Sequence, residues 1–330
     1  MPGKHPRLER FAQGGIPPEM KPMAGQVLIT GSSGMLGIDL CEELAGDYEV
    51  YGADLVANKN FICDITDRKS ISDVITKVKP DVVIHTAAWT DVDGCELVKN
   101  KAYRINSIGA ENVALGCKAA GAALIYISTD FVFDGKKKSA YKETDRPNPL
   151  SVYADSKFKG EEAVKKAIKN YFIIRTSWLY GKNGKNFVDT IIEKSKTDKE
   201  LRVVDDQVGS PTYTVDFAKA IHVLLDRVFV KREASSVKRY GIYHITNSGS
   251  VSWYEYAKTI LGLTGSDSRA LPISSKELNR PAKRPAMSVL DNSKFIALTG
   301  YRMRNWKTAL KEYLSGRESY AEKIERENPK

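Results

Sequence analysis

The chain has 330 residues, of which 42% are hydrophobic and 28% are charged, a globular composition with room for one α/β domain and a smaller lobe. It has no apolar run of the roughly 18 residues that a membrane span requires and no signal-peptide stretch near its start, so we expect a cytoplasmic protein without a membrane partner. The basic residues behind its net charge of +10 are scattered, the longest run being three lysines at 136–138, which argues against a nucleic-acid partner and suits a small anionic substrate.

The four cysteines form no CxxC pair, and the four histidines do not cluster, so we expect no structural zinc site. Cys41, Cys63 and Cys117 lie among core-type residues and are predicted to be buried thiols.

From the amino end, residues 1–25 form a Pro/Gly-rich leader that we expect to be loosely ordered, and the chain then alternates between short apolar runs and helical patterns. Strands are predicted at 26–30, 49–54, 60–64, 81–87, 123–129 and 171–177, and helices at 35–46, 67–79, 100–121 and 151–170. Several of the strands are continuously apolar, which is typical of parallel strands covered on both faces. The alternation predicts an α/β fold with a doubly wound parallel Rossmann sheet.

Beyond residue 177 the pattern changes. A helix at about 186–199 and a strand at 201–205 precede a helix at about 214–230 and a strand at 241–246 that returns to the sheet. We therefore expect a dinucleotide-binding domain of 26–177 plus about 210–247, and a substrate-binding lobe of 178–209 plus 248–315. Residues 316–330 form a charged tail, expected as a solvated helix or a frayed end.

A glycine-rich loop follows the first strand directly and opens the first helix. Its predicted cofactor-binding residues are Gly31, Ser33, Gly34, Met35, Leu36 and Gly37. Glycines at these spacings let the backbone turn tightly against a diphosphate, and the helix amino terminus supplies free N–H groups. A glycine pattern alone also occurs in ordinary tight turns, but a strand before it and a helix after it favour the dinucleotide site.

An acidic residue, Asp54, ends the second strand and is placed to accept hydrogen bonds from the ribose hydroxyls of NAD, which would disfavour NADP; its alternative is a turn residue. Asp64, with its neighbour Ile65, ends the third strand and would meet the adenine or cap the next helix. Ala87 and Ala88, after the fourth strand, would let the cofactor lie against the sheet edge. His85, just before them, is interpreted as a packed histidine rather than a catalytic base.

Tyr153 and Lys157 are four residues apart in a helical pattern, which places the phenol and the ammonium on one helix face. A nearby lysine, together with the positive charge of an oxidised nicotinamide, should favour the phenolate by lowering the pKa of the tyrosine. The phenol can then exchange a proton with a carbonyl or alcohol oxygen. Thr129, at the end of the fifth strand, offers a hydroxyl to hold that oxygen. A tyrosine and lysine at this spacing also occur on plain surface helices, so the prediction depends on all three features together.

The segments 87–96, 128–135, 175–181, 206–212, 241–244, 284–285 and 290–291 carry a more specific likeness. On these segments, over roughly residues 26–315, the chain resembles the extended short-chain dehydrogenase/reductases and, within them, the dTDP-4-dehydrorhamnose reductase family. The resemblance implies a catalytic triad of Thr129, Tyr153 and Lys157, with Asn106 supporting the lysine. The residues that would face the sugar nucleotide are Thr90, Val92, Asp130, Trp178, Gln207 and Arg284, and Thr90 and Asn106 would also lie at the cofactor.

The activity implied by the resemblance is reduction, by NADPH or NADH, of the C4 ketone of dTDP-4-dehydro-β-L-rhamnose to dTDP-L-rhamnose. It also implies a homodimer assisted by Mg²⁺, whose ligands the sequence does not assign. Lys182 and Lys185, with Arg284, are basic residues that could offset the charge of the diphosphate in the sugar nucleotide. Each is equally expected as a solvated surface residue. The sequence departs from the family's usual residues at Ile38–Asp39 and at Ala154–Asp155, and the first departure leaves the cofactor preference open.

Three other functions compete with the reductase. A related dehydratase would carry an Asp–Glu pair after the threonine, whereas this chain has Asp130 and then Phe131. Another nucleotide-sugar epimerase or reductase remains open. A binding protein that resembles the regulatory subunit of methionine adenosyltransferase is also open, but the intact triad and the 206–212 segment favour the reductase.

Overall fold

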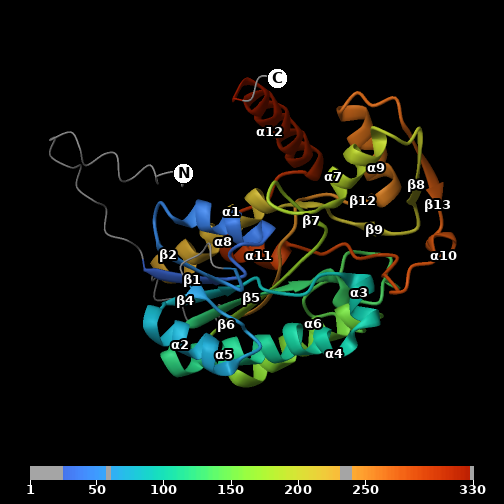
Figure 1. The fold of residues 1–330 in the computed structure, drawn as a ribbon. Helices are drawn as coiled ribbons and strands as arrows, with labels where there is room; N and C mark the ends of the chain where they lie inside the picture. The colour runs from blue at the N-terminus through green and yellow to red at the C-terminus, as the bar shows by residue number, and fades with distance from the viewer. Residues whose placement is uncertain (1–24, 57–60, 231–239, 328–330) are drawn as a thin grey trace, which may run out of the picture.

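The computed structural model describes residues 25–56, 61–230 and 240–327. Its centre is a sheet of seven parallel strands in the order β11-β6-β5-β4-β1-β2-β3, so the predicted doubly wound parallel sheet is confirmed (Figure 1). The strands are β1 (Gln26–Thr30), β2 (Glu49–Asp54), β3 (Phe61–Ile62), β4 (Val82–His85), β5 (Ala123–Thr129), β6 (Tyr171–Thr176) and β11 (Gly241–His244).

Helices cover both faces of the sheet, as the continuous apolar strands require. In Figure 1, α1 (Met35–Leu44), α8 (Thr214–Leu225) and α11 (Ser293–Thr299) lie above the sheet. The helices α2 (Arg68–Val78), α5 (Ala110–Ala120) and α6 (Val152–Ala167) lie below it. Neighbouring residues of one strand serve opposite cores: Ile29 packs under α1 and Leu28 packs over α2, both fully buried. Phe295 of α11 falls in the range expected for the lobe, yet it packs into the core of the sheet.

The long helix expected at 100–121 is divided in the structure. It begins as α4 (Lys99–Tyr103), widens into a π-helical turn, η2 (Arg104–Gly109), and continues as α5. The short helix α3 (Val92–Leu97) precedes it, capped by the side chain of Asp91, which accepts from the Gly94 amide. Widened turns of this kind are frequent at functional sites, and this one carries Asn106.

A smaller lobe lies beside one end of the sheet (Figure 1). Its helices are α7 (Phe187–Ser195), α9 (Trp253–Leu263), α10 (Ser275–Leu278) and α12 (Trp306–Glu327). Its strand pairs are β7 (Leu179–Tyr180) with β10 (Thr212–Tyr213), β9 (Val208–Gly209) with β12 (Val251–Ser252), and β8 (Glu200–Val204) with β13 (Arg269–Ile273). The core of the lobe is rich in tyrosine, since Tyr180, Tyr256 and Tyr313 meet edge to face within it.

The chain ends and the cysteines agree with the sequence-based expectations only in part. The predicted leader, apart from Gly25, lies outside the described residues, while the predicted tail is helical as far as Glu327. Cys63 and Cys117 are buried as predicted. The prediction of a buried thiol at Cys41 is wrong, because this residue is only partly buried on α1. Within the described ranges, no helix combines the length and the apolar character needed to cross a membrane.

Candidate active site

The site is a cavity of about 1270 Å³ at the carboxyl ends of the parallel strands. The glycine loop and the residues that end β2, β4, β5 and β6 line its floor, and Trp178, Lys185 and Trp253 line it from the lobe. Ligands of open parallel sheets bind in this crevice, outside the carboxyl ends of the strands. The volume exceeds the roughly 300–1,000 Å³ of ordinary ligand pockets, which suits two ligands side by side.

The glycine loop has the tight geometry that its sequence predicted. Gly31 adopts a φ of +76°, and a Cβ added there would lie 2.6 Å from the backbone nitrogen of Ala87. A Cβ at Gly37 would lie 2.2 Å from the carbonyl oxygen of Gly31. Gly34 is the N-cap residue of α1, and no side chain bonds to the first amides of the helix there. These N–H groups are therefore available to bind an anion. Ser33, Met35 and Leu36 line the same part of the cavity.

Asp54 lies in the cavity at the end of β2 and binds the glycine loop itself. Its Oδ2 accepts from the Ser33 amide at 2.9 Å, and its Oδ1 accepts from the Leu55 amide at 2.7 Å. The carboxylate therefore shapes the loop as well as facing the place expected for a ribose.

Asp64 and Ile65, expected beside the adenine, line the cavity. Ala87 and Ala88, expected to let the cofactor lie against the sheet edge, line it too, as does Thr90. Sequence reasoning missed Arg104, which also lines the cavity. Its guanidinium donates to the Thr66 hydroxyl at 3.0 and 3.2 Å. Its signal was weak, since a single arginine in a helical pattern is ordinarily a surface residue.

His85 is confirmed as a packed histidine. Its ring is buried beneath the cavity, with Nδ1 2.7 Å from the Thr30 hydroxyl, and stacks on Tyr126. Burial lowers the pKa of His85 to about 3, so it stays neutral across the physiological range.

Thr129, Tyr153 and Lys157 all line this cavity, from the end of β5 and the first turns of α6. The Lys157 ammonium donates to the Ile127 carbonyl at 2.7 Å and lies over the Tyr126 ring, 4.3 Å from its centre. The Thr129 hydroxyl donates to Asp130 Oδ1 at 3.0 Å and accepts from the Phe131 amide. The fold thus brings the three predicted side chains to one wall of the cavity.

Burial is the main cause of the pKa shifts of the titratable side chains in this wall. It lowers the pKa of Lys157 to about 7, against the opposing charge of Glu161. It raises the pKa of Asp130 to about 7, although the nearby Ser288 hydroxyl and the hydrogen bond from Thr129 oppose it. Burial also raises the pKa of Tyr153, opposed by Thr129. The expectation of a lowered tyrosine pKa is therefore wrong for this arrangement, because the ammonium is directed to a backbone carbonyl and burial prevails.

Asn106 lies behind the cavity rather than in its lining. Its Oδ1 accepts from the Trp89 amide at 2.8 Å, and its Nδ2 donates to the Trp89 carbonyl at 3.1 Å and to the Ser156 hydroxyl at 3.0 Å. Ser156 is the chain neighbour of Lys157. Asn106 therefore joins the segment after β4 to the helix that carries the tyrosine and lysine.

Trp178 forms the wall nearest the lobe and has a φ of +48°, a left-handed conformation rare for a bulky residue. Its ring stacks on Trp253, with centroids 3.4 Å apart and planes 6° apart. A Cβ added at Gly209 would lie 2.5 Å from the Trp178 indole. Sequence reasoning missed Trp253, since only the tertiary fold brings it beside Trp178.

Val92 and Asp130 line the cavity, whereas Gln207 and Arg284 do not. Gln207 is buried and donates to the Ser275 hydroxyl at 2.7 Å. Arg284 donates to both carboxylate oxygens of Asp93, at 3.1 and 2.9 Å. Burial would raise the pKa of Asp93, but these bonds prevail and lower it. Neither residue reaches the cavity, because each side chain is engaged by another part of the chain.

In the described part of the chain, no three His, Cys, Asp or Glu side chains come close enough together to hold a metal ion. The described residues of one chain therefore do not fit the Mg²⁺ expected from the resemblance, and no step of the chemistry is assigned to it.

The parallel sheet, the glycine loop and the wall of Thr129, Tyr153 and Lys157 define an oxidoreductase of the extended short-chain dehydrogenase/reductase class that uses a nicotinamide dinucleotide. Residues 25–318 match the family described as "RmlD substrate binding domain". The chain belongs to this family.

Individual proteins and a solved structure resemble the chain over most of its length. The chain is 41% identical to the spore coat polysaccharide biosynthesis protein SpsK of Bacillus subtilis, over 89% of this chain and 98% of that protein. It is 37% identical to a dTDP-4-dehydrorhamnose reductase of Aggregatibacter actinomycetemcomitans, over 87% of this chain and 97% of that protein. A crystal structure of dTDP-4-dehydrorhamnose reductase from Bacillus anthracis in complex with NADP superimposes with a TM-score of 0.81 at 40% identity, covering 89% of this chain and all of that one.

Proposed function

We propose that the chain reduces the C4 ketone of dTDP-4-dehydro-β-L-rhamnose to dTDP-L-rhamnose with NADH or NADPH. The observation that carries the proposal is the shared cavity: the glycine loop and the hydroxyl, phenol and ammonium of the predicted triad line one space. The family relatives named for this reaction support the choice of substrate.

The chemistry assigns one task to each side chain. When bound, the reduced nicotinamide supplies the hydride that C4 receives. Tyr153 donates its proton to the C4 oxygen, and its raised pKa keeps that proton available at neutral pH. Thr129 holds the same oxygen from the end of β5. Lys157 binds the nicotinamide ribose. Its positive charge also stabilises the phenolate that forms when Tyr153 gives up its proton.

The sugar would lie between this wall and the lobe. Trp178, backed by Trp253, offers a flat apolar surface to one face of the hexose. Asp130 presents Oδ2, a buried oxygen without a hydrogen-bond partner in the described structure, at the same wall. An unpaired buried acceptor is costly, so we assign it to a hydroxyl of the bound sugar. We keep Thr90 and Val92 as further contacts to the substrate, and Gln207 and Arg284 as residues that support the wall.

The finer features of the proposal are a cytoplasmic homodimer and use of both cofactors with a preference for NADH. Asp54 supports the preference, since its carboxylate would repel a 2′-phosphate. The four free cysteines support a reducing compartment. Sedimentation of the purified chain tests the dimer, and a second run in EDTA shows whether its assembly depends on a divalent cation.

One assay tests the reaction. The 4-keto-6-deoxy sugar nucleotide is made fresh by its upstream enzymes and supplied with NADH or NADPH, and cofactor loss is followed by absorbance. Mass spectrometry and NMR of the product establish the position and the stereochemistry of the reduction. Failure to oxidise the cofactor with this ketone, in a preparation that binds NADH, would refute the reductase. Binding to a methionine adenosyltransferase catalytic subunit in the same preparation would then support the regulatory-subunit alternative.

A further inference from the structure

We infer that Lys185 binds the diphosphate of the nicotinamide dinucleotide and that helix α12 positions it through Tyr313 and Arg317. This inference rests on the proposed cofactor site. It adds a residue from the lobe to a site that is otherwise built by the sheet.

The turn between β7 and α7, residues 181–186, packs on the amino end of α1. A Cβ added at Gly181 would lie 3.3 Å from Met35 Cγ, and one added at Gly184 would lie 3.0 Å from Met35 Cβ. Met35 is the first residue of α1, where the glycine loop ends. The turn therefore covers the helix terminus at which a dinucleotide diphosphate is expected.

Of the two lysines in this turn, only Lys185 faces the cavity. It lines the cavity together with Gly34 and Met35 and makes no hydrogen bond or ion pair within the described residues. Lys182 is directed to α12 instead, because a Cβ added at Gly316 would lie 3.1 Å from its Nζ. Lys185 is thus an uncompensated cation beside the amino end of a helix, an arrangement that suits a diphosphate.

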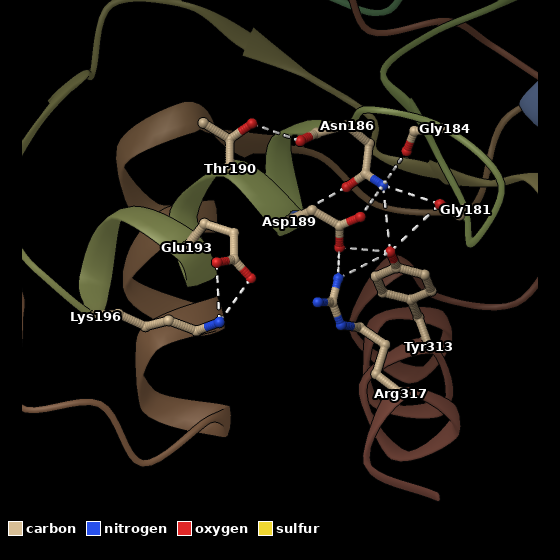
Figure 2. Close-up of polar contacts among 9 residues, drawn as sticks. All are labelled: Gly181, Gly184, Asn186, Asp189, Thr190, Glu193, Lys196, Tyr313 and Arg317. Carbon is tan, nitrogen blue, oxygen red and sulfur yellow. Dashed lines mark hydrogen bonds and ion pairs between the residues drawn. The ribbon is translucent and has the colours of Figure 1, made fainter. Parts of the chain in front are cut away.

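The turn is held by a polar network, shown in Figure 2. Asn186 donates through Nδ2 to the carbonyls of Gly181, at 2.9 Å, and Gly184, at 3.2 Å, which ties the turn to itself. From α12, the buried Tyr313 hydroxyl donates to Asp189 Oδ1 at 2.6 Å and lies 3.3 Å from the Gly181 carbonyl oxygen, a second acceptor within its reach. Arg317, one turn further along α12, pairs with the same carboxylate of Asp189.

The same turn is tied to the sheet domain at a second point. Asn183 Nδ2 donates to Oδ1 of Asp39 at 3.4 Å, and Asp39 is buried on α1. The backbone on both sides of Lys185 is therefore fixed before any ligand arrives. A fixed backbone reduces the entropy lost when the lysine binds a phosphate.

Binding measurements test the role of Lys185 without any sugar substrate. Titration calorimetry compares NADH, ADP-ribose, which keeps the cofactor's diphosphate, and dTDP, which carries that of the substrate. Lys185→Ala should raise the Kd of NADH and ADP-ribose about tenfold and leave dTDP unchanged, and Lys185→Arg should recover much of the loss. Unchanged ADP-ribose affinity, or weakened dTDP binding instead, would overturn the assignment.

The matched control is Lys196→Ala. Lys196 caps the carboxyl end of α7 and forms an exposed pair with Glu193 (Figure 2), which does not touch the turn. Its removal should leave all three affinities unchanged. A similar loss in this variant would show that general surface charge, rather than the position of Lys185, governs binding.

A double-mutant cycle tests the positioning by α12. Tyr313→Phe removes the hydroxyl but keeps the ring, and it should raise the Kd of NADH severalfold in the native chain and not at all in the Lys185→Ala background. Asp189→Asn provides a second variant for the same cycle if Tyr313→Phe folds poorly by circular dichroism. Equal effects in both backgrounds would overturn the positioning role. Because these readouts are binding constants, a chain that bound NADH as expected but left the 4-keto sugar unreduced would refute the proposed function alone.

Discussion

Two buried side chains of the cavity, Lys157 and Asp130, change charge near the same pH. Burial brings the pKa of Lys157 down to about 7 and that of Asp130 up to about 7. Below pH 7 the lysine is charged and the aspartic acid is neutral, whereas above it the lysine is neutral and the aspartate is charged. The cavity therefore becomes less positive as the pH rises, by up to two charges.

This predicts pH-dependent cofactor binding. The affinity for NADH, an anion whose charge is constant over the range, should fall by about tenfold or more between pH 6 and pH 9. Fluorescence titration at each pH measures it. Asp130→Asn should keep the Lys157 component, and Lys157→Met should keep only the Asp130 component. A Kd that is flat from pH 6 to pH 9 would contradict both assignments.

Replacing the tyrosine tests the proton donor. Tyr153→Phe should lower kcat by roughly 10²- to 10⁴-fold and leave the NADH affinity nearly intact, because the ring is kept and only the proton is lost. Steady-state kinetics at saturating substrate, with calorimetry for the cofactor, measure both. Tyr171→Phe, at the opposite end of the sheet on β6, is the control. Near-native turnover in Tyr153→Phe would mean that the proton donor has been misassigned.

Asp54 is predicted to select the cofactor. Asp54→Asn removes the charge and keeps an oxygen that can accept from the Ser33 amide, which the structure requires. The ratio of kcat/KM for NADPH to that for NADH should rise about tenfold, because the repulsion of the 2′-phosphate disappears. An unchanged ratio, measured with both cofactors under one set of conditions, would show that Asp54 serves the loop alone.

At the scale of elements, the π-helical turn η2 is the piece that joins the two sides of the site. It presents Asn106 to three hydrogen-bond partners on Trp89 and Ser156. It also presents the Asn106 carbonyl, which accepts from the Tyr126 hydroxyl at 3.3 Å. A regular helix would rotate this asparagine away, since each residue advances about 100° around the axis.

The stability of this junction can be measured. Asn106→Ala leaves buried groups without partners and should lower the free energy of unfolding by about 2–4 kcal/mol. Urea denaturation followed by circular dichroism measures the loss. Asn170→Ala, at an exposed turn before β6, should change it by less than about 0.5 kcal/mol. If the two variants were equally stable, the hydrogen bonds of Asn106 would contribute little to the free energy of unfolding.

At the scale of the whole molecule, the net charge of +10 should act on the approach of the anionic substrate and cofactor. Raising the ionic strength from 0.05 to 0.5 M shortens the Debye length from about 14 to about 4 Å. The kcat/KM for the sugar nucleotide should fall severalfold, while kcat at saturation changes little, because screening weakens the encounter rather than the chemistry. A matched series in a neutral osmolyte controls for viscosity and water activity. A kcat/KM independent of salt would indicate that the positive charge lies away from the cavity.

Local patterns in the sequence determined the doubly wound sheet, the glycine loop, the triad and the packed His85. The strands, the glycine loop and the tyrosine–lysine pair follow from neighbouring residues: apolar runs of strand length, glycines at fixed spacing, and two side chains one helical turn apart. Side-chain periodicity and local backbone geometry carry these signals, and here the tertiary structure agrees with them. The roles assigned to these residues remain predictions, which the experiments above address.

Only the tertiary structure decided which distant residues meet. It stacked Trp253 on Trp178, directed Lys157 to the Ile127 carbonyl, placed Arg284 on Asp93, and braced the turn of Lys185 with helix α12. The sign of the Tyr153 pKa shift belongs to this group, since it depends on burial by many elements at once. These contacts join residues tens to hundreds of positions apart, and their geometry follows from packing, which no local spacing encodes.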